Sequence, residues 1–420
     1  MLGVRASFFS HKPRSRRSPT EYTCRAGAAD RHLCQQFSAT PGPTKLGRDC
    51  TPAAITGDRM LNSAISRRTF LAASGAAFST MPATSATAAN NALDNVSAID
   101  CQSHLFAPAM IELMEKRTVD PVVYTSDGVR YLRMGDWRRK VPPLYLDVDA
   151  KLATMDAAGI GMTALSINDP GPEWFGDDAP AVARIANDFV AGVVSRHPTR
   201  FFGLCVLPLL DMSAALVELD RAVKQLKMRG ILLYTNLAGR FPDEPEFRPL
   251  FARAVELDVP VLLHPAKPMT TEVVKGYEMT STLGNMFDNT IALTRLIMSG
   301  LLDEFPRLKL VCPHLGGTLP YIVGRMDHQV TVLKRGPKHL ARKPSEYLQS
   351  IWLDIVSPLP LAIKFGYEFM GADRLLYASD HPWVEPRVIF DSLAEVQLSA
   401  ADQQKIMRDN ARALFRLVAE

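Results

Sequence analysis

Cysteine and long apolar runs are both scarce in this 420-residue chain, and each scarcity excludes a class of protein. The six cysteines include no Cys-x-x-Cys pair and no closely spaced even set, so neither a disulfide framework nor a cysteine zinc knuckle is expected. No apolar run reaches the roughly 20 residues that a membrane-spanning helix needs. The composition, with 47% apolar and 22% charged residues, instead predicts a chain that buries a core.

A large excess of charge of one sign is also missing from most of the chain. The formal net charge of +4 comes from residues 1–88, which hold 12 basic and 4 acidic side chains. Residues 89–420 hold 36 basic and 40 acidic side chains, so this part of the chain is slightly acidic. Nucleic-acid binding by the body of the protein therefore loses its main support, and no nucleic-acid partner is predicted.

The N-terminal part of the chain has the features of a targeting signal. Residues 1–59 are polar and rich in Arg, Ser and Pro, which would suit a disordered tail or a transit peptide. A twin-arginine export signal explains the sequence better than either of these, because its three parts follow one another in the expected order. They are the twin-arginine motif Ser66–Leu71, the mildly apolar run Phe70–Met81 and the small-x-small cleavage site Ala86–Ala88.

This signal also predicts the boundaries of the mature protein. Since export signals stand at the start of a protein, we expect translation to begin at Met60, just ahead of the motif. Residues 1–59 would then be an upstream extension or a disordered leader, and residues 60–88 a signal peptide. Residues 89–420 would form one domain that is exported and resides in the periplasm.

The remaining chain alternates short apolar runs with amphipathic helical stretches. Most of the runs are continuous in Val, Ile, Leu and Phe, as in strands that are buried on both faces. Eight such strands alternating with helices predict a (β/α)8 TIM barrel in preference to a doubly wound sheet. The predicted strands are Ser97–Cys101, Met162–Ile167, Phe201–Pro208, Gly230–Thr235, Val259–His264, Leu308–Pro313, Ile351–Val356 and Leu375–Ser379. The clear helices are Ala179–Ser195, Ser213–Leu226, Phe247–Leu257 and Asn289–Glu304.

One connection is too long for a plain turn between a strand and a helix. It runs from Phe106 to about Leu146, and long loops at the catalytic end of a barrel usually cover the site. We therefore expect this segment to be a loop above the active site. Its polar and aromatic side chains include Tyr124, Arg130, Arg133, Trp137, Arg138 and Arg139.

Side chains that bind metals gather at the C-terminal ends of the predicted strands. Each histidine there would be weak evidence by itself, but the eighth strand of a barrel closes onto the first, so the set converges on one mouth. A His/Asp set suits Zn²⁺ and leaves a position open for water or substrate. Four of the nine histidines and one aspartate belong to the set, namely His104, His264, His314, Asp380 and His381.

These motifs resemble those of the amidohydrolase superfamily, in the branch related to aminocarboxymuconate-semialdehyde decarboxylase. The resemblance covers roughly residues 97–418, and the motif after the sixth strand is the most specific part of it. The matching motifs are Met155-Asp156-x-x-Gly159-Ile160, Asn187-Asp188, Pro198-x-x-Phe201, Glu218-Leu219, His264-Pro265, His314-x-Gly316-Gly317-x-x-Pro320-Tyr321-x-x-Gly324-Arg325, Ser379-Asp380-His381-Pro382 and Asn410-Ala411.

The resemblance implies one divalent metal ion, Zn²⁺ with Mn²⁺ as the alternative, bound by His104, His264 and Asp380. Gln102 stands where the family usually has a first histidine, and it either binds through its amide oxygen or forms a hydrogen bond beside the metal. The implied catalytic residues are Asp380 and His314. Asp380 would be both ligand and proton acceptor, and His314 would orient water or move a proton.

Two enzymatic functions remain open at this point, together with one non-enzymatic function. The nearest branch implies non-oxidative decarboxylation of an unsaturated or aromatic carboxylic acid. The same groups could instead hydrolyse a lactone, ester or amide, with metal-bound water as the nucleophile. A metal-free barrel that binds a sugar or an acid is the third reading.

The predicted substrate is a small molecule in each enzymatic case. Arginines of the long connection, or Arg240 after the fourth strand, are candidates for binding a substrate carboxylate. Trp174 and Trp383 follow strand ends and are candidates for the walls of an aromatic pocket. A homodimer is left open.

Overall fold

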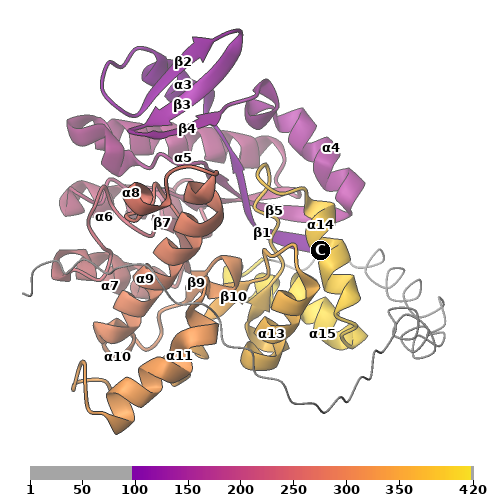
Figure 1. Cartoon of the computed structure of the whole chain (residues 1–420). Helices are drawn as coiled ribbons and strands as arrows, with labels where there is room; N and C mark the ends of the chain where they lie inside the picture. Colours follow the sequence, from indigo (N-terminus) through magenta and orange to yellow (C-terminus); the bar gives the residue numbers. More distant parts are fainter. Residues whose placement is uncertain (1–96, 418–420) are drawn as a thin grey trace, which may run out of the picture. The chain divides into compact units, whose positions relative to one another are not determined.

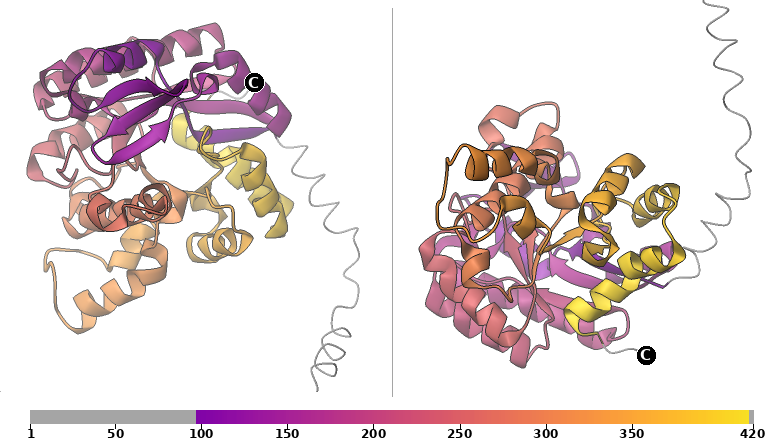
Figure 2. Two further views of the ribbon diagram at one scale, coloured as in Figure 1. Left: turned by 45° about the horizontal axis from the view of Figure 1, so that its top comes forward. Right: turned by 90° about the horizontal axis from the view of Figure 1, so that it is seen from below.

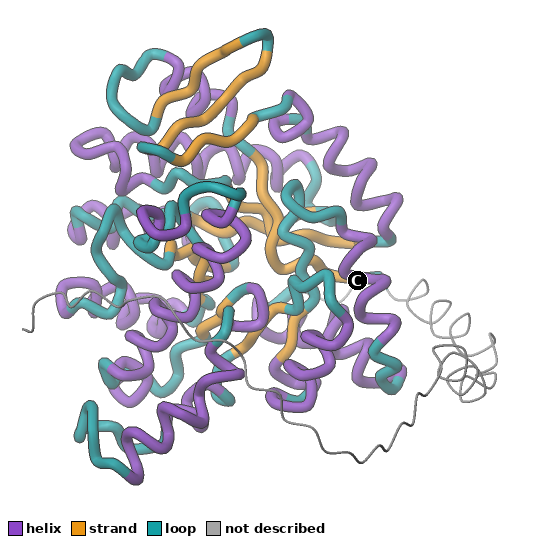
Figure 3. The backbone as a smooth tube through the Cα atoms, in the orientation of Figure 1, coloured by secondary structure: helices purple, strands orange, loops and turns teal. Residues whose placement is uncertain are grey.

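The computed structural model describes residues 97–417, and the predicted leader and signal peptide lie outside this range. Eight parallel strands form one sheet in the order β1-β5-β6-β7-β8-β9-β10-β11. Figure 3 shows these strands inside a layer of helices. The predicted (β/α)8 barrel is therefore confirmed, and each predicted run overlaps one strand, although the first two strands extend beyond the predicted runs. The strands are β1 (Ala98–Leu105), β5 (Ile160–Ile167), β6 (Phe201–Cys205), β7 (Gly230–Tyr234), β8 (Val261–His264), β9 (Leu310–Cys312), β10 (Trp352–Asp354) and β11 (Leu375–Leu376).

The barrel closes between β1 and the segment that follows β11, through isolated backbone hydrogen bonds and not through a long ladder. The Asp380 amide donates to the Gln102 carbonyl at 2.9 Å, and the His104 amide donates to the His381 carbonyl at 2.8 Å. This seam therefore brings the predicted ligands of the first and eighth strands onto adjacent segments.

Helices surround the strands, as the two views of Figure 2 show. Local sequence sets their ends: the Asp147 carboxylate caps α4 by accepting from two backbone amides, and Gly159 ends this helix in the left-handed conformation. The α-helices outside the long connection are α4 (Val148–Ala158), α5 (Ala179–Arg196), α6 (Met212–Lys224), α7 (Arg248–Leu257), α8 (Thr271–Val274), α9 (Asn285–Met298), α10 (Leu301–Glu304), α11 (Leu319–Asp327), α12 (Pro344–Leu348), α13 (Pro360–Met370), α14 (Pro386–Glu395), α15 (Ala400–Gln404) and α16 (Asn410–Phe415).

One predicted helix, Asn289–Glu304, is two helices in the structure. It starts four residues earlier, at Asn285, and is broken at Gly300, which has a φ of 78°. Glycine adopts this left-handed conformation without a steric penalty, so the chain can turn there between α9 and α10.

The long connection is not a plain loop, so this part of the prediction is wrong. It holds helix α3 (Pro108–Glu115) and a three-stranded antiparallel sheet, which Figure 1 shows apart from the barrel strands. The pair Asp127-Gly128 joins the first two strands with φ values of 51° and 73°. Such a pair between two apolar runs is a hairpin signal that was present in the sequence. The three strands are β2 (Val122–Ser126), β3 (Val129–Met134) and β4 (Trp137–Lys140).

Two predicted absences concern the described part of the chain. Within residues 97–417, no helix combines the length and the apolar character that crossing a bilayer requires. The three cysteines of the same range are buried and form no disulfide with one another.

Candidate metal centre and active site

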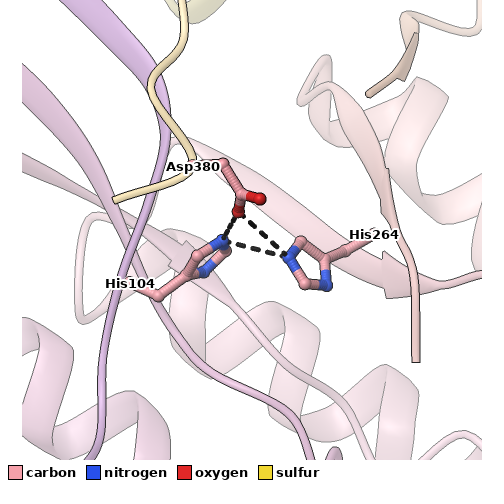
Figure 4. Close-up of side chains that lie close together, drawn as sticks. All are labelled: His104, His264 and Asp380. Atoms are coloured by element: carbon pink, nitrogen blue, oxygen red, sulfur yellow. Dashed lines mark hydrogen bonds and ion pairs between the residues drawn. The ribbon is translucent and has the colours of Figure 1, made fainter. Parts of the chain in front are cut away.

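Three predicted ligands converge at one end of the barrel. His104 lies near the end of β1, His264 is the last residue of β8, and Asp380 follows β11. One donor atom from each lies within 4.8 Å of the other two. The two Nε2 atoms are 3.0 Å apart, and the Asp380 Oδ1 atom is 3.2 Å from His104 Nε2 and 4.0 Å from His264 Nε2. Figure 4 shows the three side chains pointing toward one another.

The protonation of the two imidazoles suits a metal site. His264 Nδ1 lies 2.7 Å from the Pro265 carbonyl oxygen, which only accepts, so Nδ1 carries a proton and Nε2 is the ring nitrogen that faces the cluster. His104 Nδ1 lies 2.8 Å from Ser166 Oγ. Burial and, second, the neighbouring His264 lower the pKa of His104 to about 4, so this ring is neutral at pH 7. Two imidazoles and a carboxylate are donors that suit a divalent transition metal.

The Asp380 carboxylate supplies the negative charge of the cluster. Burial alone would raise its pKa, but the neighbouring imidazoles of His104, His264 and His314 outweigh burial and hold it well below the usual value. Asp380 also has a φ of 59°, in the left-handed region that costs a non-glycine residue about 1–2 kcal/mol. The seam hydrogen bond from the Asp380 amide fixes this conformation.

Gln102 contacts the carboxylate through its amide nitrogen. It lies two residues before His104 on β1, where alternate side chains share a face, and is buried. Its Nε2 donates to Asp380 Oδ1 at 3.0 Å. Gln102 is thus a hydrogen-bond partner of Asp380 in this structure.

His314 lies beside the cluster and contacts the other carboxylate oxygen. Its Nε2 is 3.3 Å from Asp380 Oδ2, whereas the two imidazoles of the cluster approach Oδ1. Its Nδ1 is 3.0 Å from Asn289 Nδ2, and its backbone amide donates to Asp354 Oδ1 at 2.7 Å. Burial lowers the pKa of His314, but the hydrogen bond and charge of Asp380, together with the charge of Asp354, outweigh it, and the net shift is upward.

A cavity of about 760 Å³ opens over this group of side chains. His264, His314 and Asp380 belong to its lining, and Trp383 forms part of its wall. The long connection therefore does lie over the site, as predicted, although as a sheet. Strands β3 and β4 contribute Tyr131, Trp137, Arg138, Arg139 and Lys140 to the lining.

Arg139 is the most enclosed arginine of this lining. Its side chain is 13% exposed and forms an ion pair with Asp169 at 2.6 Å. The guanidinium carbon lies 4.7 Å from the ring centre of Trp137 and 5.0 Å from that of Trp383. From sequence, all the arginines of the long connection are equal candidates for binding a substrate carboxylate. Only the fold distinguishes Arg139 from the others.

Two predicted substrate-binding residues lie outside the cavity. The Arg240 guanidinium pairs with Glu244 and Glu246 and lies over the ring of Phe247. Trp174 lies on η2 (Pro172–Asp178) and packs against the hydrophobic core. Neither belongs to the lining of the cavity formed by the described residues. Of the three candidates, Trp383 alone lines this cavity.

Sequence reasoning missed the residues that hold the cluster in place. Asp354 had a signal that was not used, since it is a carboxylate at the end of a buried strand, just as His264 ends its own. Three other residues that contact the site gave no signal in the sequence, because a single polar residue within an apolar strand or a helix forms no motif. These are Ser166 on β5, Asn289 on α9 and Lys151 on α4.

The sequence of this protein is similar to those of known proteins along most of the described chain. A sequence profile of the family described as Amidohydrolase matches residues 99–417. The chain belongs to the amidohydrolase family. It is 33% identical over 300 residues to gamma-resorcylate decarboxylase of Rhizobium sp. (strain MTP-10005), covering 67% of this chain and 91% of that protein. It is 26% identical over 330 residues to 2-amino-3-carboxymuconate-6-semialdehyde decarboxylase of Dictyostelium discoideum, covering 74% and 90% respectively.

A solved amidohydrolase-family structure adds a metal. It is dihydroxybenzoic acid decarboxylase from Polaromonas sp. JS666, with bound manganese and the inhibitor 2-nitroresorcinol. Identity is 29% and the TM-score is 0.66, over 77% of this chain and 97% of that one. With the His-His-Asp cluster, this neighbour indicates a divalent-metal site in an amidohydrolase-family enzyme. The predicted family and its decarboxylase-related branch are confirmed.

Proposed function

We propose that this protein is a metal-dependent decarboxylase that releases CO₂ from a hydroxylated aromatic carboxylic acid without an oxidant. The observation that carries the proposal is the contact of His314 Nε2 with Asp380 Oδ2 in the lining of a cavity that also contains two tryptophans, beside three candidate metal donors. The two curated relatives described above are decarboxylases by name, and neither is a hydrolase. This supports decarboxylation over the hydrolytic alternative.

For the metal, we propose His104 Nε2, His264 Nε2 and Asp380 Oδ1 as ligands, with Gln102 holding Asp380. The bound ion would supply a positive charge that binds and polarises the carboxylate and hydroxyl oxygens of the substrate. Two metal ions are candidates. The nitrogen and oxygen donors suit Zn²⁺, the ion that the sequence analysis favours. The manganese bound in the Polaromonas structure supports Mn²⁺ instead.

For the substrate, we propose Arg139 and the two tryptophans as binding groups. Arg139 Nε is buried and has no hydrogen-bond partner among the described residues, so it is free to donate to an anionic oxygen. Trp137 and Trp383 offer flat apolar faces against which an aromatic ring can pack. Arg138 and Lys140 add positive charge to the lining, which favours entry of an anion.

The reaction replaces a C–C bond with a C–H bond. His314 Nε2 would deliver a proton to the ring carbon that carries the carboxylate, and the ionised Asp380 would stabilise the protonated form of His314 before transfer. The C–C bond then breaks, its electron pair returns to the ring, and CO₂ leaves. A proton from solvent restores His314. The reaction consumes one proton and transfers no electrons, so it requires no redox cofactor.

The products formed by the metal-loaded protein test this proposal. With 2,6-dihydroxybenzoate or a related hydroxybenzoate, we expect one CO₂ for each molecule consumed, measured by a coupled bicarbonate assay. In D₂O the aromatic product should carry one deuterium at the carbon that lost its carboxylate. Unsubstituted benzoate is the matched control, because it lacks the hydroxyl group that stabilises the protonated ring. Turnover of esters or lactones without CO₂ would instead establish the hydrolase.

We also propose export through the twin-arginine pathway, on the order of the motif, apolar run and cleavage site in residues 60–88. N-terminal sequencing of exported protein should then begin near Ala89. The double variant Arg67→Lys/Arg68→Lys should stay in the cytoplasm, because the pathway reads the arginine pair. Active cytoplasmic protein that still carries residues 1–59 would contradict the proposal.

A further inference from the structure

A lysine lies buried next to the proposed metal ligands, with several hydrogen-bond acceptors around its amino group. Lys151 belongs to α4 and is 2% exposed. Its Nζ lies 2.6 Å from Ser103 Oγ and 3.0 Å from the His104 carbonyl oxygen. It also lies 2.8 Å from His381 Nδ1 and 3.1 Å from the His381 carbonyl oxygen. A lysine has at most three N–H donors, so these acceptors use all of them.

The acceptors lie on both sides of the seam that closes the barrel. Ser103 and His104 lie near the end of β1, whereas His381 belongs to the segment after β11. A proposed ligand is part of each side, because His104 is itself a ligand and His381 directly follows Asp380. The regular ladder does not extend along this seam, where Ser103 and His381 form only an isolated bridge.

A second set of hydrogen bonds spans the same seam. Asp100 Oδ2 accepts from Ser379 Oγ at 2.6 Å, and Asp100 Oδ1 accepts from the Ser379 amide at 2.9 Å. Asp100 Oδ1 also accepts from the Gln102 amide at 3.2 Å. These buried polar groups therefore form hydrogen bonds that hold β1 against the segment that bears Asp380.

We infer that Lys151 is a positioning residue of the metal centre, which sets the separation of His104 and Asp380 by tying both sides of the seam to one amino group. The inference rests on the proposed ligand set but not on the proposed reaction. Without Lys151, the carbonyls of His104 and His381 lose their shared donor, and the two ligands can move apart. Groups that orient metal ligands in this way are typically worth about ten- to a hundred-fold in metal affinity.

Mn²⁺ binding without substrate tests the inference. Titration of the metal-free protein, followed by the electron paramagnetic resonance signal of free Mn²⁺, gives the dissociation constant. For Lys151→Met, which keeps the aliphatic stem, we expect this constant to rise about ten- to a hundred-fold. The variant Lys151→Gln keeps two N–H donors, and its constant should rise less.

Asn187→Ala is the matched control. The Asn187 side chain clamps both backbone groups of Val206 at 3.0 Å, just after β6, a strand that bears none of the proposed ligands. This variant should lower the melting temperature while its Mn²⁺ dissociation constant stays within about twofold of the parent value.

The outcomes separate this inference from the ligand assignment. Unchanged Mn²⁺ affinity in Lys151→Met, with a lowered melting temperature, would make Lys151 a purely structural residue and overturn the inference. If Lys151→Met yields no folded protein, unchanged affinity in Lys151→Gln overturns it equally. If His264→Ala also binds Mn²⁺ like the parent, the ligand set itself is wrong.

Discussion

Replacing His264 by alanine should empty the metal site and abolish turnover. The His264 Nε2 atom lies 3.0 Å from His104 Nε2 and faces the cluster, while Nδ1 contacts the Pro265 carbonyl. Alanine offers no donor, and the truncated side chain leaves only one imidazole and one carboxylate in the proposed set. Elemental analysis should find close to one equivalent of Zn²⁺ or Mn²⁺ in the parent protein and a small fraction of that in His264→Ala.

The control for this variant is His328→Ala. His328 is an exposed histidine on η6 (His328–Val332) and does not line the cavity. Its replacement removes an imidazole from the surface, so metal content and turnover should both stay at the parent level. Full metal occupancy in His264→Ala would show that His264 is not a ligand, and the proposed centre would have to be reassigned.

Replacing His314 by alanine should keep the metal and remove most of the activity. His314 contacts Asp380 Oδ2, on the side away from the Oδ1 atom that faces His104 and His264. Its loss therefore leaves the three proposed donors in place but removes the proton donor, which is worth about a hundred- to ten-thousand-fold in rate. Measuring turnover and metal content on the same samples separates the two effects.

Asp380→Asn provides the contrast with His314→Ala. Asparagine keeps the shape of the side chain but removes the negative charge that three histidines approach, so both metal content and turnover should fall. If His314→Ala instead loses its metal, and added metal restores its activity, then His314 is a ligand and the two roles are exchanged.

The common location of these residues could be predicted from sequence because of how a parallel barrel is built. Strands buried on both faces are short continuous apolar runs, so eight of them were visible without a structure. Residues directly after such runs share one end of the barrel. This brought His104, His264, His314 and Asp380 together in the prediction, and the structure has them in contact.

The sequence also contained local signals that were read incompletely. The hairpin pair Asp127-Gly128 sets its own turn through two left-handed residues, and it predicts strands where a loop was expected. Gly300 likewise marks a break within a helical pattern. Both features depend on neighbouring residues alone, so in principle they were available from sequence.

The tertiary structure alone decided which polar side chains meet the site. Both Arg240 and Arg139 pair with carboxylates, but Arg240 lies outside the cavity, whereas Arg139 lines it between two tryptophans. Lys151 contacts His381 across 230 positions of sequence, and Gln102 meets Asp380 across 278. The apolar pattern determines the barrel and the end at which chemistry collects, because burial acts on each strand separately. A contact across the seam depends on the closure of the whole barrel, so no local sequence pattern can predict it.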